Sequence, residues 1–324
     1  MTVSGWRGAR DGLSGLAGPG LAAVRAGASV VVRGRFARLR FHFLAVPGGG
    51  AVLLDAGGRT GETRLRAPEA RVVVVEAGPG EAAEVVARSA GIRLLGVGCD
   101  AVEGGPWYAA VGVNGARVDR LNAIPEPILA ASLRAEAPSR VALAFGTNEA
   151  RDPRFDEASY AGTLTEALGR IRRALPSAAL VVVGAPDQGG IPPARLDAVI
   201  RAQRRSAAAA PAEFVDLRAA MGGAGTAARW ASAASPLAAR DLVHFTDAGY
   251  RELARFVAPA LAGVSPDAIP ATASRSRGTH VAPAPVRSGE GEGGIRTYRD
   301  AAGRLVLSNT GPPSDGALLG RTPR

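Results

Sequence analysis

The sequence contains no lysine, so all 39 of its Lys and Arg residues are arginines. A Schiff base, a phosphate-loop lysine and a serine–lysine dyad each need a lysine amine, and these three kinds of site are therefore excluded. The arginines outnumber the 29 acidic residues and give a formal net charge of +10, but they are scattered along an Ala-, Gly- and Pro-rich chain and form no single basic stripe. We therefore expect no nucleic-acid partner.

Cysteine and histidine are scarce as well. The single cysteine, Cys99, can form neither an intramolecular disulfide nor a cysteine-rich zinc site. The three histidines, His42, His244 and His280, disfavour a histidine-rich metal site. We expect the protein to use no metal and no organic cofactor.

Long apolar runs are also missing. The opening stretch MTVSGWRGARDGLSG has arginines and glycines where the apolar region of an export signal would stand, and no run is long enough to span a membrane. As written, the chain is predicted to be soluble and not exported, with no integral membrane segment. A beginning missing from the sequence would leave the same pattern.

The first third of the chain has the pattern of β-structure. Residues 1–27 are Gly-rich, and we expect only an N-terminal remnant there. From residue 28 to about 105, short apolar runs such as SVVVRG, LRFHFLAV and RVVVVEAG are broken by glycines. Short strands with regularly spaced turns are typical of a sandwich or barrel. The prediction for 28–105 is a β-sandwich.

Residues 106–263 change to strands that alternate with helices. Continuous apolar runs alternate there with segments of helical periodicity, which predicts a parallel sheet covered by helices on both faces. The expected strands are 141–146, 178–186 and 213–217, and the expected helices are 157–175, 193–210 and 247–262.

Beyond residue 263 the composition changes again. Residues 264–293 are rich in Pro, Ser, Arg and Gly and are typical of a disordered linker. In the tail, residues 294–324, two β-prone runs flank Asp300-Ala-Ala-Gly303 and predict a β-hairpin. Such a hairpin is too small to be stable alone.

Polar residues that follow buried strands are the first candidates for a site, because ligands of open α/β sheets bind at the carboxyl ends of the strands. In VALAFGTNEA, Asn148 follows a strand, and its amide can donate to a developing oxyanion. In GVNGARVDRL, Gly115 would let the backbone approach a ligand and offer its N–H as a second donor. An ordinary turn also explains each motif taken alone.

The stretch DLVHFTDAGY places Asp241 three positions before His244, on a loop that leads into a helix capped by Thr246. A carboxylate at this spacing can hold an imidazole in one tautomer and stabilise the imidazolium, which a general base serving a hydroxyl nucleophile requires. A plain surface histidine is the alternative, and geometry decides between the two.

Taken together, these blocks resemble a known family. Gly-x-Asn-Gly, then Gly-Thr-Asn after a strand, then Asp-x-x-His before the last helix are similar to the second, third and fifth blocks of the SGNH (GDSL-type) hydrolases. The flanking sequences GVNGA, FGTNEA, VDLRAAMGG and DLVHFTDAGY resemble the peptidoglycan O-acetylesterase branch, in which a glutamate like Glu149 tends to replace the family's aspartate. The resemblance covers about residues 107–261.

The resemblance implies a three-layer α/β/α sandwich with a parallel sheet, preceded by a β-sandwich that resembles a carbohydrate-binding module. Carried over position by position, it implies His244 as the base, Asp241 as the residue that orients it, and the Gly115 N–H and Asn148 amide as the oxyanion donors.

The family's nucleophile block, Gly-Asp-Ser, does not occur in the chain. Ser4 and Ser14 precede the β module but follow no buried strand, and Cys99 is more simply a small apolar residue at a strand end. Without its central strand the sheet would leave backbone groups of both neighbouring strands unpaired. We therefore expect an export signal, the first strand and the serine upstream of Met1, which would place the protein in the periplasm or outside the cell.

The function implied by the resemblance is a serine esterase that removes O-acetyl groups from cell-wall carbohydrate, inactive as written because the serine is absent. The alternative is a non-catalytic glycan-binding or envelope-organising protein on a degenerate hydrolase fold. Retention of the four site residues favours the esterase. The acyl group, the sugar and the oligomeric state are not predicted.

Overall fold

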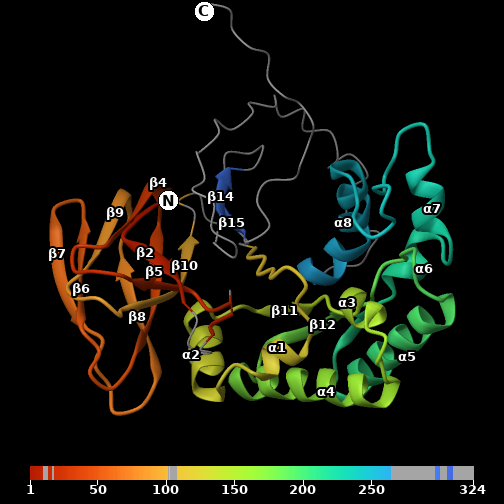
Figure 1. Cartoon of the computed structure of the whole chain (residues 1–324), viewed down its shortest axis with the longest axis horizontal. Coiled ribbons are helices and arrows are strands. Elements are labelled where there is room, and N and C mark those ends of the chain that lie inside the picture. Colours follow the sequence, from red (N-terminus) through yellow and green to blue (C-terminus); the bar gives the residue numbers. More distant parts are fainter. Residues whose placement is uncertain are drawn as a thin grey trace, which may run out of the picture.

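The structure is a computed structural model of the chain (Figure 1). It describes residues 1–9, 14–16, 18–100, 102 and 108–263, together with the backbone of 296–299 and 305–308. The linker expected at 264–293 lies outside the described residues. In the tail, β14 (Arg296–Arg299) and β15 (Leu305–Ser308) pair antiparallel, as expected for the hairpin.

The N-terminal unit consists of two five-stranded sheets, with strand orders β1-β4-β9-β6-β7 and β2-β3-β10-β5-β8. Every strand pair in both sheets is antiparallel. The strands are β1 (Thr2–Ser4), β2 (Trp6–Gly8), β3 (Leu21–Ala23), β4 (Ser29–Phe36), β5 (Arg38–Ala45), β6 (Ala51–Ala56), β7 (Arg59–Arg64), β8 (Arg71–Ala77), β9 (Gly80–Ala87) and β10 (Arg93–Asp100).

The prediction that residues 1–27 form only a remnant is wrong, because β1, β2 and β3 extend both sheets. Glycines make this possible. Gly20 has a φ of 69°, and a Cβ there would lie 2.3 Å from the Leu94 carbonyl oxygen of β10. The Gly-rich composition that argued against regular structure instead lets the chain turn closely against its neighbouring strand.

Strand β5 is buried along both faces from Leu39 to Ala45, which is unusual for an antiparallel sheet with one face in water. Phe41 and Phe43 point into the core between the two sheets. Leu44 belongs instead to the core of the α/β unit, and Arg40 and His42 are also buried. The second sheet therefore has its outer face covered by the α/β unit.

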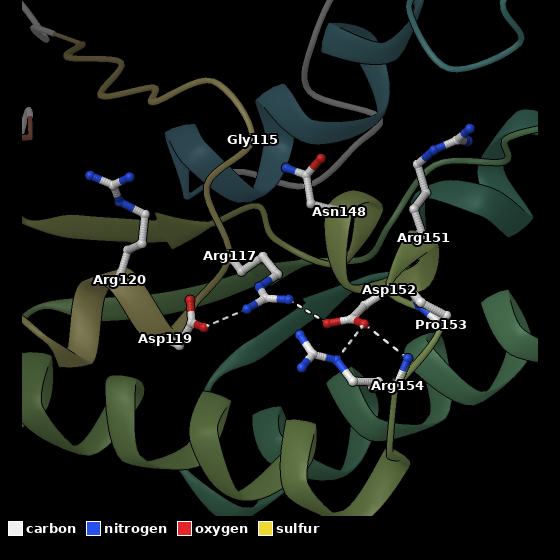
Figure 2. Close-up of a pocket in the computed structure, with 9 residues that line it drawn as sticks. All are labelled: Gly115, Arg117, Asp119, Arg120, Asn148, Arg151, Asp152, Pro153 and Arg154. Carbon is white, nitrogen blue, oxygen red and sulfur yellow. Dashed lines mark hydrogen bonds and ion pairs between the residues drawn. The ribbon is translucent and has the colours of Figure 1, made fainter. Parts of the chain in front are cut away.

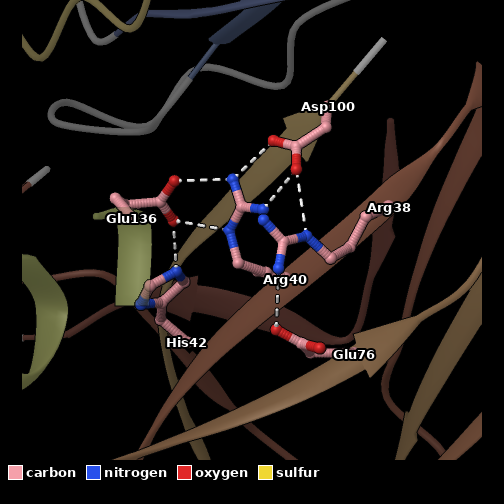
Figure 3. Close-up of polar contacts among 6 residues, drawn as sticks. All are labelled: Arg38, Arg40, His42, Glu76, Asp100 and Glu136. Atoms are coloured by element: carbon pink, nitrogen blue, oxygen red, sulfur yellow. Dashed lines mark hydrogen bonds and ion pairs between the residues drawn. The ribbon is translucent and has the colours of Figure 1, made fainter. Parts of the chain in front are cut away.

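The charged residues on this outer face of β5 meet the end of helix α2 (Glu126–Glu136) (Figure 3). Glu136 accepts hydrogen bonds from Arg40 Nη2 at 2.8 Å and faces His42 Nε2 at 2.6 Å. Arg40, which is 1% exposed, also donates to both oxygens of Asp100 at 2.7 Å. A Cβ on Gly98 would lie 2.6 Å from the Glu136 carboxylate, so a glycine leaves the space for it.

The ion pairs at this interface determine the ionisation of Glu136. Burial works to raise the pKa of Glu136, but the hydrogen bonds from His42 and Arg40 outweigh it and lower the pKa to about 2. The interface between the two units is therefore held by a carboxylate that is ionised at neutral pH.

The C-terminal unit contains a parallel sheet in the order β11-β12-β13. Its strands are β11 (Arg140–Leu143), β12 (Ala179–Val183) and β13 (Glu213–Val215). Besides α2, its helices are α1 (Asp119–Asn122), α3 (Thr147–Arg151), α4 (Glu157–Ala174), α5 (Pro193–Ala209), α6 (Leu217–Met221), α7 (Thr226–Ala231) and α8 (Asp247–Ala262). The three predicted helices agree with α4, α5 and α8 to within one residue at each end.

Successive residues of β12 face opposite layers of helices. Leu180 and Val182 belong to the core shared with α4 and α5, whereas Val181 and Val183 belong to the core shared with α6 and α8. A continuous apolar strand is required because both faces are covered. The predicted three-layer α/β/α arrangement is confirmed (Figure 1).

Strand β11 lies at one edge of this sheet and, among the described residues, pairs only with β12. Residues 108–113, which precede α1, form no strand, and Tyr108 and Val111 are 74% and 55% exposed. The outer edge of β11 therefore presents backbone groups that no described strand pairs.

The buried carboxylate of Glu149 connects two loops at the end of this sheet. Its Oε1 accepts from the Val118 N–H and its Oε2 from the Gly146 N–H, both at 2.8 Å. Gly146 begins helix α3 with a φ of 110°, and a Cβ there would lie 2.8 Å from the Gln203 amide nitrogen. Glu149 therefore fixes the segment before α1 against the start of α3.

No helix in the described part of the chain is both long enough and apolar enough to cross a membrane.

Substituting glutamine for Glu136 should lower the free energy of unfolding at pH 7 by about 3 kcal/mol, because it leaves the buried Arg40 without one of its two carboxylates. The folded-state pKa is below the ordinary 4.5, so this stabilisation is complete above about pH 4.5 and is lost as the pH falls through about 2. Denaturant unfolding at pH 7, 4.5 and 2.5 measures it. Glu76→Gln, in an exposed pair 3.9 Å long, is the control and should cost less than about 1 kcal/mol.

Glu149→Leu should lower the free energy of unfolding by about 2–5 kcal/mol, because each of two buried N–H groups left without an acceptor costs about 1–3 kcal/mol. Glu149→Gln keeps one amide oxygen as an acceptor and should lower the free energy of unfolding by less. Denaturant unfolding compares both with Glu81→Gln, an exposed position on β9. Equal stabilities of Glu149→Leu and the control would show that the carboxylate does not connect the loops.

Candidate functional site

Gly115 and Asn148, 33 positions apart in the sequence, line one groove at the carboxyl end of β11 (Figure 2). The groove has a volume of about 510 Å³, in the usual range of ligand pockets. Its other lining residues come from the start of α1 and from α3 with the turn after it: Arg117, Asp119, Arg120, Arg151, Asp152, Pro153 and Arg154.

The Asn148 side chain is held toward the Gly115 turn. Its Nδ2 donates one hydrogen bond to the Ala116 carbonyl at 2.8 Å, which fixes the amide plane. An amide NH₂ has two N–H groups, so the second remains available to a ligand. The same bond ties the Gly115 turn to α3, in addition to the link through Glu149.

Gly115 has a φ of 67°, the left-handed region that favours glycine. A Cβ at this position would meet no atom within 4 Å. The glycine is therefore required by the backbone conformation and not by lack of space. Gly115 is exposed and lies in the wall of the groove beside Asn148.

Asp241 and His244 form a hydrogen-bonded pair in the loop before α8. His244 Nδ1 lies 2.7 Å from Asp241 Oδ2, and Oδ1 accepts from the backbone N–H groups of Val243 at 2.9 Å and His244 at 3.0 Å. A carboxylate acceptor requires the proton on Nδ1, which leaves Nε2 of the neutral ring as a base. The imidazole is 72% exposed.

The same contacts determine the charge of Asp241. The backbone N–H of His244 contributes most, followed by the His244 ring and the Val243 N–H, and together they lower the pKa of Asp241 to about 2. The carboxylate is therefore ionised at neutral pH and can stabilise an imidazolium.

The histidine loop is closed on itself and begins α8. Thr246 accepts from the Gly249 N–H at 3.2 Å, which confirms the predicted cap, and Ala239 N–H donates to the His244 carbonyl at 2.8 Å. Leu242 has a φ of 59°, which is strained for a bulky side chain. The contacts around Leu242 hold this strained residue, and strain of this kind is typical of functional sites.

Two hydrogen bonds connect the histidine loop to the groove. The Gly189 N–H donates to the Leu242 carbonyl at 2.8 Å, and Arg151 of α3 donates to the Gly189 carbonyl at 3.1 Å. Gly189 lies after β12, so the carboxyl ends of two neighbouring strands position the two halves of the site. Asp241 and His244 do not themselves belong to the described lining of the groove.

The sequence reasoning did not identify Gln188 and Gly189 as part of this arrangement. They follow the strand over 179–183 in the run GAPDQGG, so the rule that selected Asn148 would have selected them too. The arginines of the groove were also not singled out, because a single arginine among 39 carries no positional signal.

Among the described residues, no cluster of three or more His, Cys, Asp or Glu side chains could hold a metal ion. Cys99 does not line the groove, and desolvation raises the pKa of its thiol.

Residues 93–252 match the model of the GDSL-like Lipase/Acylhydrolase family. A solved structure described as "Peptidoglycan O-acetylesterase in action, 5 min" is similar with a TM-score of 0.64 and 25% identity, over 81% of this chain and 78% of that chain. No curated protein sequence matches the chain.

Two further solved structures are similar at lower scores. One is a lipase/acylhydrolase from Enterococcus faecalis, with a TM-score of 0.36 and 21% identity over 47% of this chain and 74% of that chain. The other is a family two carbohydrate esterase from Clostridium thermocellum, with a TM-score of 0.31 and 12% identity over 81% of this chain and 97% of that chain.

The family match spans every block that the sequence analysis singled out, from Gly115 to His244, and the structure gives those blocks the expected α/β/α arrangement. Residues 93–252 therefore form a domain of the SGNH (GDSL-type) hydrolase family.

Proposed function

We propose that the protein is a serine esterase that removes O-acetyl groups from cell-wall carbohydrate, with His244 as its general base. The observation that carries the proposal is the pair formed by Asp241 and His244. One Asp241 oxygen bonds the ring at Nδ1, the other accepts from the backbone N–H groups of Val243 and His244, and no described residue bonds Nε2. A histidine held in this way is prepared to accept a proton.

In the proposed reaction, a serine Oγ attacks the acetyl carbonyl carbon while His244 Nε2 takes the hydroxyl proton. The Gly115 N–H and the second N–H of Asn148 donate to the resulting oxyanion. Collapse of the tetrahedral intermediate breaks the bond to the sugar oxygen, which receives the proton from His244. A water molecule then attacks the acyl-enzyme by the same steps and releases acetate.

We propose that the serine comes from a strand outside the 324 residues that pairs with the free edge of β11. Two observations support this placement. The chain has no Gly-Asp-Ser, and the outer edge of β11 has no described partner. A parallel strand added there would end beside Asn148, because the carboxyl ends of parallel strands lie at the same edge of a sheet.

The proposed substrate class and location follow from similarity. The structure with a TM-score of 0.64 is that of a peptidoglycan O-acetylesterase, and the similarity extends over the β-sandwich, since it covers 81% of the chain. We propose that the sandwich is a carbohydrate-binding-like module and that the protein acts in the periplasm or outside the cell.

A glycan-binding protein without catalysis is the second candidate, favoured by the absence of the nucleophile block from the sequence. It predicts that a chain supplied with Gly-Asp-Ser binds glycan and hydrolyses no ester. The intact geometry of Asp241, His244 and Asn148 supports the esterase, because a binding protein has no evident need for an oriented base.

The 324-residue chain itself should hydrolyse an aryl acetate at close to the background rate, because removal of a triad nucleophile costs about a millionfold in kcat. A spectrophotometric assay against buffer measures this. Robust turnover that survives further purification would contradict the absence of a nucleophile and would require one within the chain.

A longer chain, in which a strand followed by Gly-Asp-Ser precedes Met1, should hydrolyse the aryl acetate. In that chain, His244→Ala should lower kcat by about 10⁴–10⁶, and Asn148→Ala by about 10²–10³, because each removes a group that acts in the transition state. Arg64→Ala, exposed on β7 of the sandwich, is the control and should retain full activity. Activity of His244→Ala equal to that of the control would refute the proposal.

A further inference from the structure

The groove beside Asn148 carries an excess of positive charge. Its lining includes four arginines, Arg117, Arg120, Arg151 and Arg154, against two aspartates, Asp119 and Asp152, which leaves two positive charges. Acyl transfer to water requires no such excess at this place, since the oxyanion is stabilised by the two neutral N–H donors. The charge therefore needs a separate explanation.

Both aspartates of the groove are already paired. Asp119 accepts from Arg117 Nη2 at 3.0 Å, and Asp152 accepts from Arg117 Nη1 and from the backbone N–H of Arg154 at 2.9 Å. The Arg154 backbone N–H and the neighbouring guanidinium groups lower the pKa of Asp152. The Arg154 guanidinium also pairs with Asp152, its Nε lying 3.6 Å from Oδ1, so Arg117 and Arg154 both have acidic partners within the groove.

Arg120 and Arg151 are not compensated in this way. Within the described part of the chain, Arg151 donates only to neutral oxygens, the Gln188 side chain at 3.4 Å and the Gly189 carbonyl at 3.1 Å. Arg120 projects from α1, is exposed, and has no hydrogen-bond or ion-pair partner among the described residues. Figure 2 shows the two side chains on opposite sides of the Gly115 and Asn148 pair.

We propose that this groove selects a glycan that carries a carboxylate, with Arg120 as the residue that recognises it. The inference rests on the proposed function, since it places the charged group of the substrate next to the acetyl group to be removed. A guanidinium offers a planar fork of donors that matches a carboxylate with two parallel hydrogen bonds. The groove volume of about 510 Å³ is in the usual range of ligand pockets.

A nucleic acid is the other polyanion that arginines could bind, but the arrangement does not favour it. Nucleic-acid sites present a stripe of cations along the backbone path, often with aromatic side chains for stacking. Here two uncompensated arginines flank one groove, and its described lining contains no aromatic residue. A single carboxylate near the reacting ester fits this arrangement better.

The test measures binding by the 324-residue chain, which needs no nucleophile. Isothermal titration uses the disaccharide of N-acetylglucosamine and N-acetylmuramic acid, and the same disaccharide with its carboxyl group converted to a methyl ester. The free acid should bind roughly tenfold more tightly at low salt, and added salt should reduce the difference. Arg120→Ala should abolish the preference, Arg120→Lys should retain part of it, and Arg64→Ala should leave it unchanged.

The affinity for the methyl ester of the disaccharide should be the same for the wild-type chain and Arg120→Ala. This control separates loss of carboxylate recognition from loss of the fold. Equal affinity of the wild-type chain for both forms, or no binding of either form, would overturn the inference. Tighter, Arg120-dependent binding of a single-stranded oligonucleotide would overturn it too. This binding test needs no turnover. The chain completed with Gly-Asp-Ser could therefore prefer the carboxylate and still hydrolyse no ester. That result would refute the proposed esterase activity and leave the carboxylate inference intact.

Discussion

The geometry of the site depends on one buried carboxylate. Glu149 is buried and has no cationic partner among the described residues, and it accepts from two backbone N–H groups in segments 28 residues apart, at Val118 and Gly146. These bonds set the distance between the Gly115 turn and α3, and therefore the distance between the two proposed oxyanion donors. A side chain one methylene shorter could not span the same two donors without moving one loop. This gives a physical reason for a glutamate at this position of the Gly-Thr-Asn block.

The second half of the site is positioned independently of the first. The histidine loop is held by its own short-range bonds, from Asp241 to two backbone N–H groups and from Thr246 to the first turn of α8. Among the described residues, hydrogen bonds through Gly189 and Arg151 link this loop to the groove. Each half is therefore held mainly by its own local hydrogen bonds. Such an arrangement would orient the proposed base and the proposed oxyanion donors before any ligand arrives.

Periodicity in the sequence predicted the elements that bury continuous apolar faces. The helices α4, α5 and α8 and the strand β12 were predictable because their apolar positions repeat at the helical period or fill a strand buried on both faces. Among the site motifs, Asn148 follows such a strand, whereas Gly115 and the Asp241–His244 pair follow no described strand directly and were indicated by their motifs. Three short N-terminal strands were missed, since glycines there allow close approach of strands and this role cannot be recognised without the partner strand. The link through Gly189 was missed although Gly189 follows β12, because its partner loop at Leu242 is distant in the sequence.

The double burial of β5 has a consequence for how this architecture can evolve. One face of the strand fills the sandwich core, and the other carries Leu44 and the Arg40 ion pairs against α2. Excising the sandwich would expose apolar surface on the remaining unit and remove the hydrogen bonds of Glu136 to Arg40 and His42. Domain shuffling exchanges accessory modules between enzymes by recombination at flexible linkers. Here it would strongly destabilise the unit that remains. The two units are expected to be inherited together and to change by paired substitutions across their shared face.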